Sequence, residues 1–410
     1  MTHPALRPLL LALSIALLPA GAALAGNGLY LDIPAIPGES TDPGHVGQID
    51  VGGLSWGVSV TITRRSGSPP DISRPSVQDM AWMQGLDQSV LPLFTSITSS
   101  QSQPSARFEL VKPGAPKQAP FLSLTAEQAT ISSMSFGGSS GSDTAVQASM
   151  SPAAVTLRYD PAALGGTGPA QATRYDLLTN TTTGPSGRQP VDEPGNALAR
   201  AGLYLRLGSG ATAIAGDSQA FGYENWIAID SFSMGTSNAA SPGGQMTSQP
   251  SVSELSWSQS LDATAPALLF NLLEGQSIGQ ATIEKVVLDR NGRPVTVMQQ
   301  ALNDVLFSSF SLGANDASNV GVIGSMGFAS FTQTLWPMRA DGSRGGPFSF
   351  GFDVVTGKAI PGALAGNVDG FGNGNLDGSA VPVPEPQTWA MMLAGIAGLL
   401  GLARRRRAAV

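Results

Sequence analysis

One sequence pattern occurs twice in this chain, and it constrains the fold more than any other feature. Segments 75–87 and 250–262 align residue by residue at a spacing of 175 positions. Each contains a tryptophan, Trp82 or Trp257, with apolar residues at alternate positions around it. Such alternation predicts a strand with one buried face. An apolar run with helical character follows each strand, so the chain reads as a duplicated strand–helix unit.

The second helical run has clear boundary signals. Pro266 stands near its start and Gly275 follows its end, the positions at which helices favour proline and glycine. The corresponding run in the first unit covers residues 89–94. We therefore expect one short helix in each unit.

Three further pairs of segments support the duplication. They are Gly28 to Leu31 with Gly202 to Leu205 (174 positions apart), Ser55-Trp56-Gly57 with Ser233-Met234-Gly235 (178 positions), and Ser132 to Gly137 with Ser308 to Gly313 (176 positions). Small changes in spacing are what loop insertions between matched strands produce. The second unit also predicts a hairpin, in which 281–288 and 295–306 flank a tight turn at Asn291-Gly292.

Composition favours an all-β protein with long loops. Charged residues make up only 12% of the chain, whereas glycine and proline are abundant. Cysteine is absent, which excludes disulfides and thiolate chemistry. Without Arg7 and the four arginines Arg404 to Arg407, the formal charge of −7 becomes −12. A body this acidic argues against nucleic acid as a partner, because phosphate binding needs a basic face.

The N-terminus has the pattern of a secretory signal peptide. Arg7 precedes an apolar run, and Ala23 and Ala25 are the small residues before Gly26. We expect signal peptidase to cut after Ala25, because a permanent anchor needs a longer apolar run.

The C-terminus has three parts in order. Val383-Pro384-Glu385-Pro386 comes first, an apolar segment from Trp389 to Ala403 follows, and Arg404-Arg405-Arg406-Arg407 closes it. The apolar segment can just cross a bilayer, with the arginines as the cytoplasmic stop. This tail resembles the PEP-CTERM sorting signal of Gram-negative bacteria. The resemblance implies an inner-membrane intermediate, cut by an exosortase-type protease near Pro384-Glu385, and then a position at the cell surface or outside the cell.

The body resembles the Hcp (haemolysin-coregulated protein) family of type VI secretion tube proteins. The residues that carry the resemblance are Leu29 to Asp32, Ile36-Pro37-Gly38-Glu39-Ser40, His45 to Val51, Ser55-Trp56-Gly57 and Ser76-Val77-Gln78-Asp79. It covers residues 28–160 and, more loosely, 202–355, and it implies small β-barrels with one helix each that assemble into hexameric rings. Family tube proteins leave the cell without a signal peptide, so this chain is not expected to be a working tube subunit.

These signals predict a mainly β chain with two tandem Hcp-like barrels. The expected segments are a signal peptide (1–25), the first barrel (26–160), a linker (161–201), the second barrel (202–356), a flexible spacer (357–382) and the sorting signal (383–407) with its transmembrane segment.

Few residues suggest catalysis. His45 is the one histidine after the leader, and it lies in a polar loop, so we interpret it as a loop residue and not a base. Asp50, Asp79 and Asp87 recur in the second unit as acidic residues, which favours roles at turns and helix caps over an acid pair. We therefore predict no catalytic residue, no cofactor and no metal site, and we interpret Trp82 and Trp257 as core residues.

Two functions remain open. One is a non-catalytic structural or interaction protein of the cell surface or extracellular matrix, and the other is a secreted module that binds or hydrolyses exopolysaccharide. Assembly also remains open. Three chains would supply the six barrels of a ring, but a monomer in which the two barrels pack together is at least as well supported.

Overall fold

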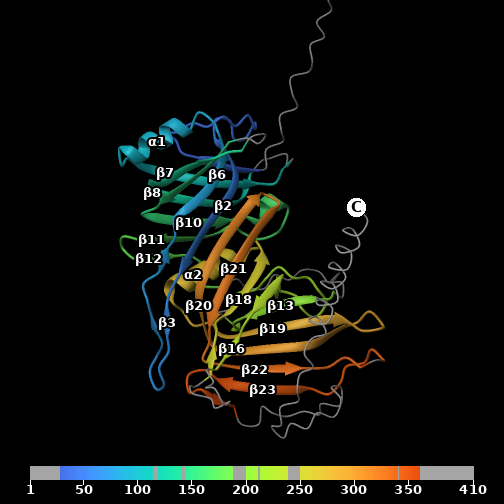
Figure 1. Ribbon diagram of the computed structural model, residues 1–410. Coiled ribbons are helices and arrows are strands. Elements are labelled where there is room, and N and C mark those ends of the chain that lie inside the picture. The colour runs from blue at the N-terminus through green and yellow to red at the C-terminus, as the bar shows by residue number, and fades with distance from the viewer. Residues whose placement is uncertain are drawn as a thin grey trace, which may run out of the picture. The chain divides into compact units, whose positions relative to one another are not determined.

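A computed structural model describes residues 28–113, 119–139, 144–187, 200–210, 213–238, 250–339 and 341–360. All of these residues belong to one compact unit of the chain. The described chain is built mainly of antiparallel strands, with two α-helices (Figure 1).

The first half forms a closed six-stranded barrel. Its elements are β1 (Leu29–Asp32), β2 (Ile49–Ser59), β3 (Ile62–Thr63), β4 (Asp71–Ile72), β5 (Ser76–Val77), β6 (Met80–Gly85), α1 (Val90–Thr98), β7 (Ser102–Val111), β8 (Pro120–Gly137), β9 (Ala145–Ser151), β10 (Ala154–Tyr159), the 3-10 helix η1 (Pro161–Leu164), β11 (Gln171–Asp176) and β12 (Thr181–Thr183). The barrel closes in the order β1, β2, β6, β9, β8, β7 and back to β1. Strands β10 to β12 continue from β8 as an extension.

The second half repeats this plan. Its elements are β13 (Gly202–Leu207), β14 (Ile227–Ile229), β15 (Ser231–Ser233), β16 (Thr236–Ser237), β17 (Ser251–Val252), β18 (Leu255–Ser260), α2 (Ala265–Glu274), β19 (Gly279–Leu288), β20 (Pro294–Asp316), β21 (Asn319–Gly327), β22 (Ser330–Leu335), β23 (Phe348–Asp353) and β24 (Lys358–Ala359). The pair β14 and β15 stands where β2 stands in the first half, and the barrel closes through β18, β21, β20, β19 and β13. The duplication predicted from sequence is therefore present in the barrel strands and in the helix of each half, whereas the hairpin β3–β4 has no counterpart among the described residues of the second half.

The tryptophan strands follow the predicted alternation. In β6 the side chains of Met80, Trp82 and Gln84 are buried, and the residues between them are exposed. Trp82 packs edge-on against Phe108 at 5.9 Å between ring centroids, and Trp257 lies 5.9 Å from Phe307. Each tryptophan thus fills its own barrel, and the prediction that both are core residues is confirmed.

Turns and helix ends also follow the predicted signals. Pro266 lies in the first turn of α2, and Gly275 ends that helix with a left-handed φ of 61°. In the β19–β20 turn, the carboxylate of Asp289 accepts hydrogen bonds from the backbone of Asn291 and Arg293, and Gly292 has a φ of 71°. Glycine adopts such φ values without the steric cost that a Cβ brings.

Part of the expected linker is folded. Residues 171–183 form β11 and β12, which pair antiparallel with β10 and with each other. This corrects the linker prediction for that segment, because its threonines and Tyr175 supply strand residues to a sheet that β10 leaves open. At the other end, β24 reaches Ala359, and the remaining spacer lies outside the described residues.

No helix among the described residues is long and apolar enough to span a membrane. The expected transmembrane segment from Trp389 to Ala403 lies outside the described residues, as does the expected signal peptide.

Candidate functional site

The predicted processing sites lie outside the described residues. This applies to Ala23, Ala25 and Gly26 at the leader, and to the sorting motif and arginine cluster after residue 382. The described residues therefore bear on the catalytic predictions and on how the two halves are joined.

His45 lies in a loop, as predicted, but it is buried. Its side chain is only 3% exposed, and its ring stacks on Tyr30 at 4.1 Å between centroids. Its Nδ1 lies 2.9 Å from Oε1 of Gln48 and 3.3 Å from a carboxylate oxygen of Glu109. The Tyr30 hydroxyl donates to Asp42, and burial raises the pKa of Tyr30 well above its usual range. The loop position agrees with the prediction, whereas the contact with the Tyr30 ring cannot be seen from the sequence.

The second half builds the same cluster with a tyrosine in place of the histidine. Tyr223 stacks on Tyr204 at 4.5 Å, and its hydroxyl donates to Glu284 at 2.7 Å. Burial raises the pKa of Tyr223 to about 12, so this phenol keeps its proton at neutral pH. The stacking and the carboxylate contact are repeated, whereas the group that could exchange a proton is not. This pattern is typical of a structural cluster that closes the first loop over the barrel.

The predicted carboxylates hold turns and strands. Asp87 accepts hydrogen bonds from the backbone N–H of Ser89, at the start of α1, and from the side-chain amide of Gln84. Gln84 in turn accepts a bond from Nε1 of Trp82 at 2.7 Å.

The same relay recurs beside α2. Trp257 donates to Gln259 at 2.8 Å, Gln259 donates to Asp262 at 3.0 Å, and Asp262 accepts from the backbone of Thr264. Asp79 and its counterpart Glu254 accept from serine hydroxyls of β8 and β20. The prediction that these carboxylates act at turns and helix starts is confirmed for Asp87 and Asp262. Within the described part of the chain, no three His, Cys, Asp or Glu residues are placed to share a metal ion.

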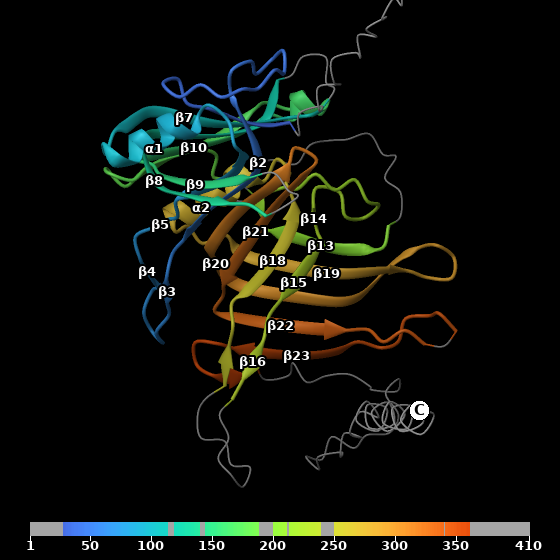
Figure 2. The same cartoon turned by 45° about the horizontal axis from the view of Figure 1, so that its top comes forward.

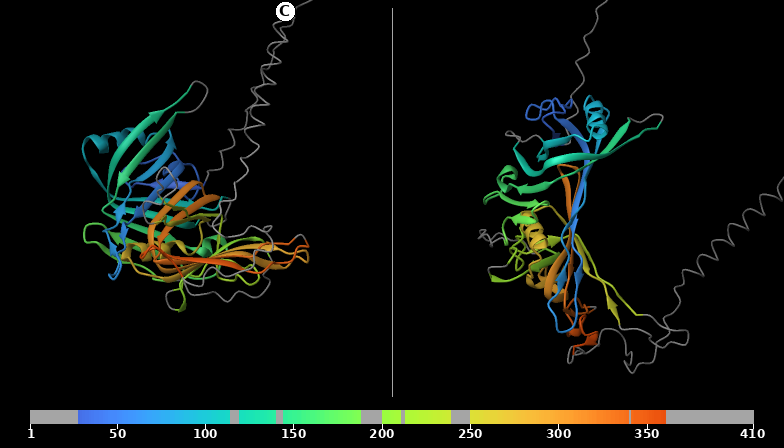
Figure 3. Two further views of the ribbon diagram at one scale, coloured as in Figure 1. Left: turned by 60° about the horizontal axis from the view of Figure 1, so that its bottom comes forward. Right: turned by 90° about the vertical axis from the view of Figure 1, so that its left-hand side faces the viewer.

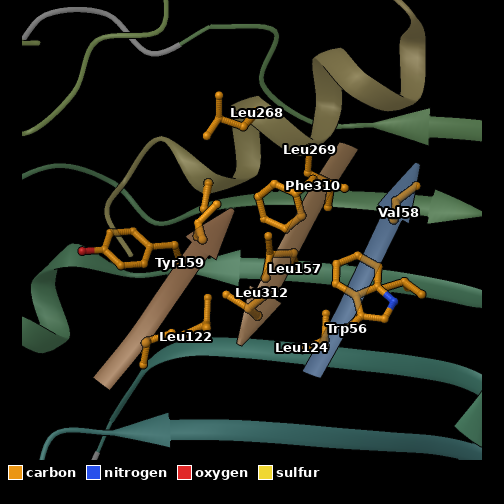
Figure 4. Packing of buried hydrophobic residues seen from close by; sticks show 14 of the residues in the cluster. Trp56, Val58, Leu122, Leu124, Leu157, Tyr159, Leu268, Leu269, Phe310 and Leu312 are labelled. Atoms are coloured by element: carbon orange, nitrogen blue, oxygen red, sulfur yellow. The ribbon is translucent and has the colours of Figure 1, made fainter. Parts of the chain in front are cut away.

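The two halves are joined by a direct strand pairing. Residues 54–59 of β2 lie antiparallel to residues 309–314 of β20, so that Trp56 faces Leu312 and Val58 faces Phe310. Trp56 and Phe310 are both nearly inaccessible, and their rings lie 6.3 Å apart (Figure 4). We call this pairing, with the helix and hairpin described next, the junction.

Helix α2 closes the junction on one side. It belongs to the second half but packs against β10, β11 and β12 of the first. The Thr173 hydroxyl donates to the carbonyl of Pro266 at 2.6 Å, and the Asn271 amide donates to the carbonyl of Ser186 at 2.7 Å. Leu268 and Leu269 are buried beside Leu157 and Tyr159 of β10 in the same cluster (Figure 4).

A hairpin closes the junction on the other side. Strands β3 and β4 extend from β2 and lie beside the strands of the second half (Figure 3). There Arg64 forms an ion pair with Asp304, and its guanidinium also donates to the Asp304 carbonyl at 2.6 Å. The Arg64 side chain is 13% exposed and that of Asp304 is 46% exposed, so the ion pair is shielded from water mainly on the arginine side.

The junction makes one continuous sheet from both barrels. Its strand order is β8, β9, β6, β2, β20, β21, β18, β15 (Figure 2). Its outward face has small hydroxyl side chains, namely Ser55, Ser133, Ser135, Ser149, Ser231, Ser233, Ser256, Ser258, Ser309, Ser311 and Ser325. A pocket of about 580 Å³ lies on its first-half portion, where it is lined by Asp79, Met83 and Gln147 among others. Trp82 lies beneath this pocket but is only 2% exposed, so it offers no platform for a sugar.

The sequence reasoning missed the junction. The matched segments around Ser55-Trp56-Gly57 and Ser132 to Gly137 showed that the halves are alike, but they did not show which edge pairs with which. The available signal was Trp56 itself, because a large aromatic residue at an edge position implies a partner that covers it.

Comparison with known proteins agrees with the fold and with the sorting signal that the sequence predicts. A family described as type VI secretion system effector, Hcp, matches residues 30–163 and 204–334. The PEP-CTERM protein-sorting motif matches residues 382–407. A curated relative, protein hcp1 of Pseudomonas aeruginosa, is 28% identical over 134 residues, which cover 32% of this chain and 83% of the relative.

Solved structures with similar folds include Hcp1 from Salmonella typhimurium, which is 22% identical with a TM-score of 0.32 and covers 38% of this chain and 97% of its own. A type VI secretion system effector from Yersinia pestis is 19% identical with a TM-score of 0.28, and it covers 36% of this chain and 98% of its own.

Proposed function

The chain belongs to the type VI secretion system effector Hcp family, with two family segments and a PEP-CTERM sorting motif, and we propose that it is a non-catalytic structural protein exported to the cell surface. In this proposal, signal peptidase removes residues 1–25. The C-terminal segment then holds the protein in the inner membrane until an exosortase-type protease cuts near Pro384-Glu385.

One observation carries the non-catalytic part of the proposal. The two halves keep the buried aromatic pair and its carboxylate contact, but His45 is replaced by Tyr223. Duplicated sites that needed a base would each keep a basic side chain, whereas Tyr223 is a phenol whose pKa burial raises further, to about 12. The conserved feature is therefore the packing, which is what a structural protein requires.

Export is tested on protein from its own host. We expect intact-mass measurement of the surface fraction to show a chain that begins at Gly26 and lacks Trp389 to Val410. Replacing Pro384 and Glu385 with alanine should retain the tail and leave the protein in the inner membrane. A surface product that still carries the tail would contradict the proposal.

Catalysis is tested separately on the same purified protein. We expect no turnover of polysaccharide or ester substrates. Turnover that disappears with a single change such as Asp79→Asn or Glu254→Gln would replace the structural role with an enzymatic one.

A second function has one observation in its favour. The hydroxyl-rich face and the pocket beside Asp79 and Gln147 offer hydrogen-bonding groups to a carbohydrate. Binding of the host's own exopolysaccharide, lost when Gln147 is changed to leucine and kept when the distant, exposed Leu178 is changed to serine, would favour this function. Binding that neither change alters would count against this pocket.

A further inference from the structure

A pocket in the second half lies between strands β13 and β19 and the loop that follows β13. Its volume is about 390 Å³, which is in the range of ligand-binding clefts. Leu207 and Ile214 form part of its apolar wall, together with Trp226. Half of its lining residues are polar, namely Arg206, Ser209, Glu224, Asn225, Gln280 and Thr282. We call it the Trp226 pocket.

The residues that line this pocket differ from their counterparts in the first half. Strand register and matching loop hydrogen bonds identify the counterparts as Asp32 for Arg206, Val46 for Glu224, Gly47 for Asn225, Gln48 for Trp226 and Arg107 for Thr282. The loop is also longer, because the spacing between matched residues rises from 174 positions at Leu205 to 178 at Gly216. The four extra residues therefore fall in the stretch that forms one wall of the pocket. Charge, aromatic area and loop length have thus all changed at one place.

Arg206 has lost the acidic neighbours that the first half provides. There Asp32 lies opposite Arg107 on the paired strand, and Arg107 forms an ion pair with Glu109 at 3.0 Å. In the second half Arg206 lies opposite Thr282. Among the described residues Arg206 forms no ion pair, so its charge is available to a ligand.

A stack of aromatic rings holds the exposed Arg206 in place. Tyr223, which stacks on Tyr204, meets the Trp226 ring edge-on at 5.2 Å, and the guanidinium carbon of Arg206 lies 4.9 Å from the Trp226 centroid. Glu284 does not neutralise the arginine, because its carboxylate accepts hydrogen bonds from three other side chains. A guanidinium stacked on an aromatic face keeps the N–H donors at its edge free to bind an anion.

Thr282 provides an independent indication of a ligand. It lines the pocket and is only 8% exposed, yet its hydroxyl forms no hydrogen bond with any described residue. Buried polar side chains are usually paired, and an unpaired one costs free energy. The indole N–H of Trp226 also lacks an acceptor within the described part of the chain. A ligand rich in hydroxyl groups would satisfy both groups.

We propose that the Trp226 pocket binds a uronic acid residue of an acidic polysaccharide, with the sugar carboxylate on Arg206. A guanidinium binds a carboxylate through two parallel N–H···O bonds. The amides of Asn225 and Gln280 and the hydroxyl of Thr282 can donate and accept, as sugar hydroxyls require. A peptide carboxylate would also fit Arg206, but the side chains of a peptide would leave these polar groups without partners.

This inference goes beyond the proposed structural role, which needs no ligand. The Trp226 pocket also shares no residue with the pocket beside Asp79 and Gln147. The carboxylate of Glu224 lines the same pocket and accepts a hydrogen bond from the backbone of Gly222 at 3.1 Å. It can accept from a sugar hydroxyl, and it disfavours a ligand with a second carboxylate at that end of the pocket.

The first test compares an acid with its own ester. We expect a short oligomer of galacturonic acid to bind the processed protein from its host in calorimetric titration. The methyl ester of the same oligomer has no carboxylate and should bind about tenfold more weakly or not at all. A peptide with a free C-terminal carboxylate should not bind. Absence of binding by the acid oligomer, equal binding of its ester, or a preference for the peptide would overturn the proposal.

The second test assigns the carboxylate to one arginine. Arg206→Gln should weaken binding of the acid oligomer about 10- to 100-fold, because it removes a charged hydrogen-bond donor. Arg65→Gln is the matched control, because it makes the same charge change at an exposed arginine between β3 and β4. It should leave binding unchanged. Equal losses in the two variants would show attraction by overall charge and would contradict a site at Arg206.

The third test separates binding from stability. Thr282→Val removes a hydroxyl that has no partner among the described residues, so the melting temperature should not fall, whereas binding should weaken about 3- to 10-fold. A lower melting temperature with unchanged binding would assign Thr282 a structural role and contradict the proposal. Gln147→Leu should leave this binding unchanged, and a loss there would place the ligand in the other pocket. Turnover of the oligomer would contradict the non-catalytic role and leave the binding site in place, so the two proposals fail separately.

Discussion

The two helices of this protein occupy equivalent places but differ in what surrounds them. Helix α2 is covered on both sides, by its own barrel and by β10 to β12, and eight of its ten residues are buried. Helix α1 has its own barrel on one side, and only Val90, Leu93 and Ser96 are buried. Packing against β10 to β12, which only α2 has, therefore accounts for the larger buried part of α2.

The two helices also differ in the residues on the side that faces β10 to β12 in α2. Helix α2 begins Ala265-Pro266-Ala267, and these small or compact residues allow the Thr173 hydroxyl to reach the Pro266 carbonyl. Helix α1 has Leu91 and Phe94 on that side, with no described strand against them. The apolar side of α1 is thus kept although nothing within the described chain requires it.

The largest effect is expected at the paired edge. Trp56→Ala should lower the free energy of unfolding by about 3 to 5 kcal/mol, because it empties a closed part of the junction. Met234→Ala, at the equivalent unpaired edge, should cost about 1 to 2 kcal/mol, since Met234 is only half-buried. Urea unfolding of the wild type and of each single variant measures both losses. Equal losses for Trp56→Ala and Met234→Ala would show that pairing with β20 does not add to the stability of the β2 edge.

The helices themselves give the next largest effect. Leu269→Ala should cost about 2 to 5 kcal/mol, because this side chain is 1% exposed. Phe94→Ala, at the equivalent position of α1, should cost about 1 kcal/mol or less, because about half of its surface stays in water. The same urea experiment reports both values, and a larger loss for Phe94 would reverse the comparison.

The polar relay beside each helix provides an internal control. Gln84→Leu and Gln259→Leu each leave a buried tryptophan N–H without its acceptor and remove one of the donors to an aspartate, at a cost of about 1 to 3 kcal/mol. Since both relays lie inside their own barrels, the two losses should agree within experimental error. A much larger loss for Gln259→Leu would mean that β10 to β12, by packing on α2, also stabilise the hydrogen bonds of Gln259.

The smallest effect concerns pH. Burial raises the pKa of Asp87, against the opposing hydrogen bonds from Ser89, so the folded protein holds this proton more tightly than the unfolded chain. The raised pKa disfavours the folded state at neutral pH, and this penalty falls as the pH drops through the folded pKa towards the ordinary value. Wild type should therefore gain stability relative to Asp87→Asn between neutral pH and about pH 4. Unfolding free energies measured across this range would show a constant difference if the buried carboxyl has no role.

The sequence predicted the parts whose signals are local. Trp82 and Trp257 lie on alternating strands, Pro266 and Gly275 bound a helix, and Asn291-Gly292 makes a turn, because each depends on neighbours along the chain. It did not predict that Ser55-Trp56-Gly57 pairs while Ser233-Met234-Gly235 does not, since the same pattern serves both. Nor did it predict β11 and β12, whose strand pairing depends on the open edge of β10 more than on their own composition. Burial of His45 was missed for a similar reason, because it depends on Tyr30, which is distant in sequence.

The junction also sets the order in which this chain can fold. Its paired residues are 250 to 260 positions apart, so β2 is synthesised long before β20 exists. Until then, the first half carries Trp56 and Val58 on an uncovered edge, which is the kind of strand that promotes aggregation. Contacts this distant in sequence also slow folding, because a large loop must close before they contribute any stability. Although the gene encodes two copies of one barrel, the first copy completes its core only when nearly all of the second has been made.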